Sequence, residues 1–353
     1  MPIDTVTVTF DRLHWFVAEI FKAAGFSPSD AAIEADVLVW ANLRGVDSHG
    51  IFRIPNYIRS IRAGDINPRP DLKIARSMGA SCIVEADRAA GPVAMVFAMK
   101  EATKLARQHA LGWVLVRNAT HTGPIGYFAR AAAAENMIGI VTSASKPLMA
   151  YHGTRVPTLS TNPLAIAVPR AEGPPLTLDM ATAEIAWGKL VQARRAGTPL
   201  PNGVALDSAG QATTDPARAL LPLPLAGAKG AGLSLMIECM TSLLVGAPLI
   251  EPTLSDRGAG SDQWQHGLAI AVDIAAFTEV GAFVENAEEL AKAIKAQPRA
   301  DGFDEVLMPG ERGDRILAER RANGIPVPRD QWDALVEAAA SYGLQPPTVD
   351  EIP

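Results

Sequence analysis

The first part of the chain carries apolar residues at helical spacing. One apolar stripe predicts a first helix and is formed by Phe10, Leu13, Val17, Ile20 and Phe21. Gly25 would end this helix. Residues 27–30 (Ser-Pro-Ser-Asp) combine a capping hydroxyl, a proline at the first helical position and an acid, so they predict a second helix, running to about Gly45. A third stripe continues to Gly64, and Pro55 within it marks a kink or a late helix start.

From about residue 80 the pattern changes to short apolar strands between helices. Strands are predicted at 113–117, 137–144, 163–169, 175–180 and 267–275. Helices are predicted at 91–110, 125–135, 182–196, 229–245, 285–296, 310–322 and 329–342. This order indicates an α/β (α+β) fold in three parts, namely a helical region at 1–75, an α/β region at 76–280 and a second helical region at 281–353.

The composition is that of a globular protein. A chain of 353 residues is long enough for about two domains, and 48% hydrophobic with 20% charged residues argues against a disordered or fibrous protein. A net charge of −6 without a basic, aromatic-interleaved cluster argues against nucleic acid as a partner. We expect no membrane span, because charges or glycines interrupt each apolar run before the ~18 residues needed. The isolated Cys82 and Cys239 favour a reducing, cytoplasmic setting.

The most informative segment is 44–57, where His49, Arg53 and Tyr57 follow one another at four-residue intervals. His49 and Arg53 would share one face if the segment is helical, with Tyr57 one turn further along. Histidine exchanges protons near neutral pH, whereas arginine keeps its charge and can clamp a carboxylate. The set therefore indicates an anionic substrate that gains or loses a proton. The alternative is a solvated helix face capped by Ser48 or Asp47.

Two further candidates follow strands. His121 comes after the strand at 113–117, in a glycine-containing turn that leads into a helix, a place where α/β proteins present reactive groups. It could equally be a turn histidine bonded to the local backbone. Lys146 follows the next strand and could hold a carboxylate or a cofactor phosphate, although exposed lysines are common.

The remaining polar segments suit a nucleotide cofactor. Asp179 follows a predicted strand and could accept from a ribose hydroxyl or orient a histidine, although turn residues need no function. Residues 227–232 place glycines and Lys229 at the start of a helix, which suits a phosphate. The sequence contains neither a Walker loop nor Gly-x-Gly-x-x-Gly, so a Rossmann domain is not supported.

These clusters, in this order, resemble the malate/L-lactate dehydrogenase-like family of NAD(P)-dependent oxidoreductases, which is distinct from the Rossmann-type enzymes. The matching segments are Arg44-Gly-x-x-Ser48-His49-Gly50-x-x-Arg53-x-x-x-Tyr57, Asn118-x-x-His121-x-Gly123-x-x-Gly126, Thr161-Asn162-Pro163, Asp179-Met-Ala-Thr, Thr214-Asp215-Pro216, Gly227-x-Lys229-Gly230 and Pro309-Gly310-Glu311. The resemblance implies a non-Rossmann fold, in which helices from both chain ends pack together beside a cofactor domain with a largely antiparallel sheet. It also implies an intertwined homodimer.

The same resemblance assigns roles to residues. His49 and His121 become the acid/base candidates, with Lys146 as a further catalytic residue in contact with the substrate. The substrate-binding residues would be Ser48, Arg53 and Tyr57. The residues that would line NADH or NADPH are Ser145, Thr161, Asn162, Asp179, Met180, Ala181, Lys229, Pro309, Gly310 and Glu311. No metal is expected.

The resemblance implies hydride transfer between a small 2-hydroxy acid and its 2-oxo acid. One branch of the family instead reduces cyclic imino acids such as piperideine-2-carboxylate, which is the alternative. A metal-dependent hydrolase built on the histidines is a remote alternative, because no pair has a spacing such as His-x-x-x-His. A non-catalytic binder is a further alternative. The chain departs from the family at Ser160 and His152, where glycines are usual, and this leaves the substrate open.

Overall fold

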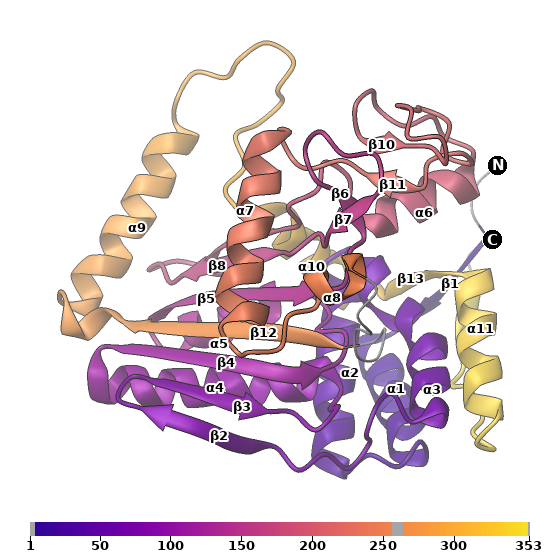
Figure 1. Ribbon diagram of the computed structural model, residues 1–353, viewed down its shortest axis with the longest axis horizontal. Coiled ribbons are helices and arrows are strands. Elements are labelled where there is room, and N and C mark those ends of the chain that lie inside the picture. The colour runs from indigo at the N-terminus through magenta and orange to yellow at the C-terminus, as the bar shows by residue number, and fades with distance from the viewer. Residues whose placement is uncertain (1–3, 256–263, 352–353) are drawn as a thin grey trace.

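A computed structural model describes residues 4–255 and 264–351, and a seven-stranded sheet lies at its centre (Figure 1). In spatial order its strands are β2 (Lys73–Met78), β3 (Ser81–Glu85), β4 (Leu111–Ala119), β12 (Gln265–Asp273), β5 (Met137–Ser145), β8 (Leu164–Val168) and β9 (Leu176–Met180). Neighbouring strands run antiparallel except β3 and β4, which are parallel and joined by the crossover helix α4 (Gly91–His109). The predicted mixed α/β fold with a largely antiparallel sheet is confirmed.

The central strands of the sheet are covered on both faces, and their alternating side chains serve two different cores, whereas the edge strand β2 is exposed. Val114 and Val116 of β4 pack with α4 and α5 (Gly126–Ala134) on one face. Leu115 between them packs on the other face with Val245, which follows α7 (Ala228–Glu238) and its π-helical continuation Cys239–Leu243. A Cβ on Gly112 would lie 1.9 Å from the Ala102 carbonyl oxygen, so only glycine lets α4 approach β4 this closely.

Helices from both ends of the chain form a second body beside the sheet, in which α11 lies next to α3 (Figure 1). α11 also contacts α1, because the rings of Trp332 and Phe16 have their centroids 5.9 Å apart. Its helices are α1 (Phe10–Ala23), α2 (Pro28–Leu43), α3 (Ile54–Ala63), α10 (Glu311–Asn323) and α11 (Arg329–Ala340). The predicted cap of α2 is confirmed, because Ser27 Oγ accepts a hydrogen bond of 3.1 Å from the Asp30 backbone. The C-terminal β13 (Ile325–Pro328) and β14 (Asp350–Glu351) pair with β1 (Thr5–Val8), which the apolar pattern did not predict.

The remaining elements are short or peripheral. They are β6 (Met149–Ala150), β7 (Pro157–Leu159), α6 (Trp187–Ala196), β10 (Ala205–Leu206), β11 (Leu221–Pro222), α8 (Ile250–Leu254) and α9 (Val280–Lys295). The helix expected at 182–196 begins only at Trp187, because Thr182 and Glu184 donate their backbone N–H groups to the Thr161 and Leu223 carbonyls instead. The helix expected at 229–245 keeps α geometry only to Glu238.

The C-terminal helices do not all lie together. α10 contacts α2 and α11 contacts α3, whereas α9 lies at the other side of the molecule (Figure 1). There the Ala171 backbone N–H donates to the Val284 carbonyl, and Arg170 lies 3.6 Å from Glu288. The three-part division at residues 75 and 280 stays a prediction. Across the described ranges, every helix is too short or too polar to cross a membrane.

Candidate active site

The segment 44–57 is not one helix. It forms two 3-10 turns, Asp47–His49 and Ile51–Arg53, and α-helix begins only at Ile54. Gly50 separates the turns, and a Cβ there would lie 2.1 Å from Asn42 Oδ1, which accepts the Ile51 N–H at 2.9 Å. The expectation that His49 and Arg53 share a helix face is therefore wrong, whereas Pro55 does mark a late helix start.

The structure nevertheless brings the predicted acid/base residues together. His49 and His121 stack with ring centroids 5.6 Å apart, although 72 residues separate them in the chain. Tyr57 Oη lies 2.5 Å from His121 Nδ1, and Ser48 Oγ lies 3.0 Å from His49 Nδ1. Each imidazole thus has its Nδ1 held by a hydroxyl group, which leaves the Nε2 atoms for a ligand.

Arg53 lies beside these rings and is fixed through one nitrogen. Its Nε donates to the Ser48 carbonyl at 2.8 Å. Within residues 4–255 and 264–351, no acidic side chain pairs with the Arg53 guanidinium. The terminal nitrogens are therefore suited to an incoming carboxylate, the bidentate geometry that arginine favours.

The electrostatics of the site keep both imidazoles neutral. Burial, with a contribution from the Arg53 charge, lowers the pKa of His49 to about 3. Burial, Arg53 and His49 together hold the pKa of His121 well below its usual value. Burial also raises the pKa of the Tyr57 phenol, with a smaller contribution from Glu34. A bound carboxylate would offset the Arg53 charge and bring the imidazoles back toward the range where they exchange protons.

The predicted cofactor residues lie at the strand ends and loops near the β9 end of the sheet. Asp179 is exposed, and its Oδ2 accepts the Gly126 N–H at the start of α5 at 3.0 Å. Lys229 is also exposed and lies in the first turn of α7. Asn162 differs, because it is fully buried and donates to the Ser234 carbonyl at 3.0 Å, so it anchors α7 from within. Met180 and Ala181 are partly buried.

The two departures from the family pattern lie in different surroundings. Ser160 is buried, and its Oγ lies 2.5 Å from Ser145 Oγ, so a pair of hydroxyl groups joins the end of β5 to the segment after β7. Lys146 follows Ser145 at the end of β5, and Thr161 follows Ser160. His152 is exposed and lies beside Gly227, the residue before α7. Within the described part of the chain, no three His, Cys, Asp or Glu side chains group as for a metal.

Arg44 is a residue to which the sequence analysis gave no role. It is 8% exposed, forms an ion pair with Asp314 and donates to the Gly310 carbonyl at 2.9 Å. Arg130 lies 3.0 Å from the same Asp314 and donates to Thr177 Oγ1 at 3.1 Å. This network holds the turn Pro309-Gly310-Glu311 against the end of α2, so the predicted substrate and cofactor segments are tied together. The sequence signal that could have identified Arg44 was its place at the start of the segment Arg44-Gly-x-x-Ser48-His49.

Helix α6 covers the segment 44–57, called the substrate segment because it carries the predicted substrate-binding residues. A Cβ on Gly188 would lie 2.0 Å from Ser48 Cβ, so the two backbones meet without room for a side chain. Arg195 of the same helix lies over the Phe52 ring at 5.4 Å and pairs with Asp330 of α11 at 2.9 Å. The sequence pattern predicted a helix here but not that it would cover His49 and its neighbours.

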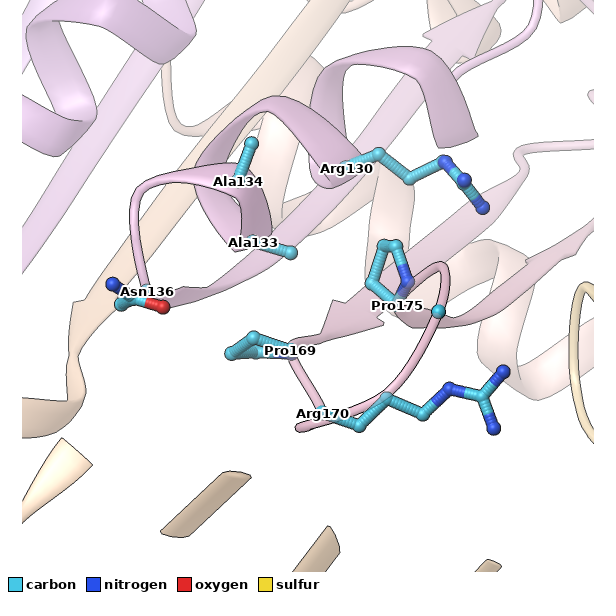
Figure 2. A pocket seen from close by; sticks show the side chains of 8 residues that line it. Arg130, Ala133, Ala134, Asn136, Pro169, Arg170 and Pro175 are labelled. Carbon is cyan, nitrogen blue, oxygen red and sulfur yellow. The ribbon is translucent and has the colours of Figure 1, made fainter. Parts of the chain in front are cut away.

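A surface hollow of about 290 Å³ lies away from the two histidines, at the β8–β9 turn (Figure 2). Arg130 and Arg170 line it together with Asn136, Pro169 and Pro175. Arg170 donates to the Pro174 carbonyl and Arg130 belongs to the Asp314 network, so both guanidinium groups are already engaged. None of the predicted site residues lines this hollow.

Comparison with known proteins identifies the family. A sequence model of the malate/L-lactate dehydrogenase family matches residues 8–336. L-sulfolactate dehydrogenase of Methanocaldococcus jannaschii is 37% identical over 331 residues, which cover 93% of this chain and 95% of the relative. The crystal structure of malate dehydrogenase from Entamoeba histolytica matches with a TM-score of 0.92 at 27% identity, over 98% of this chain and 100% of that chain. Delta1-piperideine-2-carboxylate reductase from Pseudomonas syringae pvar. tomato matches with a TM-score of 0.82 at 29% identity, over 94% and 99%. The chain is therefore an oxidoreductase that belongs to the malate/L-lactate dehydrogenase family.

Proposed function

We propose that the protein interconverts a small 2-hydroxy acid and its 2-oxo acid with NADH or NADPH. The observation that carries the proposal is the group formed by His49, His121 and Tyr57 beside Arg53, whose terminal nitrogens have no hydrogen-bond partner among the described residues. Such a group binds a carboxylate and exchanges one proton at the neighbouring carbon–oxygen centre. Ser48 and Lys146 complete the proposed substrate contacts.

The residues of the chain suit a nicotinamide cofactor, which supplies or accepts the hydride at C2 of the substrate. The exposed Asp179 carboxylate suits a ribose hydroxyl, and the exposed Lys229 at the start of α7 suits a phosphate. The Pro309–Glu311 turn lies beside Thr177, two residues before Asp179 in β9, and is held by Arg44. Ser145, Thr161, Asn162, Met180 and Ala181 complete the proposed lining. NADH and NADPH are both compatible with this set.

The proton moves through the histidines. In oxidation, a neutral imidazole accepts the hydroxyl proton of the 2-hydroxy acid. The lowered pKa values keep His49 and His121 neutral in the free protein, and the bound carboxylate offsets the Arg53 charge that opposes the incoming proton. In reduction, the bound carboxylate offsets Arg53, and a protonated imidazole gives its proton to the developing alkoxide. Help of this kind is worth roughly 10²–10⁴-fold in rate. We assign the proton transfer to His49 and His121, with His49 tested first.

A screen of NADH and NADPH oxidation over 2-oxo acids and cyclic imino acids, at several pH values, tests the proposal. The cyclic imino acids are included because the chain matches a piperideine-2-carboxylate reductase over most of its length. His49→Ala and His121→Ala should each lower kcat with little change in NAD(P)H binding, measured by fluorescence. Near-normal rates for both variants across the active substrates would remove the histidine assignment. An absence of NAD(P)H binding would remove the cofactor assignment.

We further propose that the chain forms a homodimer. Large apolar side chains lie exposed along α7 and the residues after it, namely Leu235, Met236, Met240, Leu243 and Leu244. Contiguous exposed apolar surface of this kind marks protein–protein contact. Light scattering at known concentration measures the mass directly, and a monomer at micromolar concentration would contradict the proposal. A cytoplasmic setting also stays our proposal, in keeping with the free thiols of Cys82 and Cys239.

A further inference from the structure

Glu34 is a fully buried carboxyl group that the proposed mechanism does not use. It lies on α2 with no exposed surface, and neither carboxyl oxygen has a hydrogen-bond partner in the part of the chain that the structure describes. Buried polar groups without partners are rare in native proteins and call for an explanation. Burial raises the pKa of Glu34 to about 8, and the charge of Asp30 one turn earlier adds to this effect. The side chain is therefore protonated at neutral pH.

The position of Glu34 joins it to the proposed active site. Ala31 and Leu38 share its face of α2, at three residues before and four after, and both belong to the buried cluster that contains Tyr57. Val37, the next residue along on this side, lies 3.5 Å from where a Cβ on Gly123 would be, two residues after His121. Glu34 thus lies where α2 meets both Tyr57 and the loop that carries His121, close enough for its charge to act on the Tyr57 phenol.

We propose that Glu34 is a positioning residue of this site, which acts through Tyr57 to set the pH range over which His121 holds a proton. The proposal rests on the function proposed above. At neutral pH the Glu34 carboxyl group is uncharged, so it exerts no electrostatic effect of a full charge on the Tyr57–His121 hydrogen bond. At alkaline pH the ionised carboxylate lies behind Tyr57 and favours the protonated form of His121.

The other charges around this pair act in known directions. Arg53 on the substrate segment and a protonated His49 both disfavour a proton on His121. Asp30 on α2 disfavours the ionised form of Glu34. α4 presents Gly91, Pro92 and Val93 to this region, none of which is charged. A substrate carboxylate on Arg53 would remove the strongest opposing charge, so the effect of Glu34 should be largest with substrate bound.

The pH dependence of reduction separates this role from simple packing. Glu34→Gln keeps the shape of the protonated side chain but cannot ionise. We expect kcat for reduction at saturating substrate to match the wild type near pH 6, with the alkaline limb displaced to lower pH by about half to one unit, a threefold to tenfold loss near pH 9. Glu288→Gln is the matched control, because Glu288 is buried on α9, on the other side of the molecule from α2 and α3, and its profile should follow the wild type. Parallel profiles for Glu34→Gln and wild type would overturn the proposal.

A second measurement does not depend on activity. Infrared difference spectra between wild type and Glu34→Gln report the C=O stretch of a protonated carboxyl group across pH 5–10. We expect this band at pH 7 and its loss above about pH 8; its absence at pH 7 would also overturn the proposal. If Glu34→Gln does not fold, Glu34→Met removes the carboxyl with an apolar side chain of similar size and must show the same displaced limb. If no substrate is reduced, the proposed function fails, but the infrared titration still tests whether Glu34 is protonated at pH 7. The failure of one proposal can therefore be distinguished from the failure of the other.

Discussion

Replacing Glu34 by glutamine should stabilise the protein at neutral and alkaline pH. In the unfolded chain the carboxyl group loses its proton around its ordinary pKa of 4.5, whereas in the folded protein burial raises the pKa to about 8. Between these values unfolding releases a proton, so the free energy of unfolding of the wild type falls as the pH rises. Glutamine has no proton to lose, so the free energy of unfolding of the variant does not decrease with pH for this reason.

The size of the effect follows from the same two values. For each pH unit above 4.5, the difference in free energy of unfolding between variant and wild type grows by about 1.4 kcal/mol, until the carboxyl group of the folded protein itself ionises. At pH 7 the variant should therefore be more stable by about 3 kcal/mol, and above pH 8 the difference should level off at about 4–5 kcal/mol. With an unfolding entropy of about 2 cal/mol/K per residue, 3 kcal/mol corresponds to a Tm higher by about 4 °C for this chain.

Thermal unfolding of wild type and variant at pH 5, 7 and 8.5 measures this directly, at one protein concentration because association also shifts Tm. At pH 5 the two proteins should unfold within about 1 kcal/mol of each other, since this pH lies only half a unit above the ordinary pKa of 4.5, at which the unfolded carboxyl group begins to lose its proton. The reasoning is refuted if the variant is equally or less stable at pH 8.5. It is also refuted if the difference between the proteins does not grow with pH.

Three further changes test the site. Gly188→Ala places a methyl group 2.0 Å from Ser48 Cβ, so it should push α6 from the substrate segment, lower kcat/KM and destabilise the fold by about 1–3 kcal/mol, measured by kinetics and thermal unfolding. Arg53→Lys keeps the charge but loses the planar pair of donors, so KM for the oxo acid should rise roughly tenfold or more with kcat less affected. Arg44→Lys removes the bond to the Gly310 carbonyl, and the Kd for NAD(P)H should rise about twofold to tenfold by fluorescence titration; an unchanged Kd would show that this turn is held without Arg44.

Local structure could largely be read from the sequence. The Ser27 cap and the apolar stripes placed α1 and α2, and short apolar runs placed the long strands of the central sheet within a few residues. The local pattern was insufficient where a neighbour decided the conformation. Gly50 breaks the helix expected through His49 because Asn42 occupies the space beside it, and β1 exists only because β13 returns to pair with it.

By itself the sequence determined the family and the oxidoreductase class, and it supplied the residues that we propose for the chemistry, because these depend on which side chains occur and in what order. His49, Arg53, Tyr57 and His121 were identified in this way. Only the tertiary structure decided that Tyr57 bonds His121 and that Arg44 holds Gly310. It also left Glu34 buried without a partner. Such contacts join residues dozens to hundreds of positions apart, and their distances and burial arise from the packing of whole helices and strands, which no local spacing encodes.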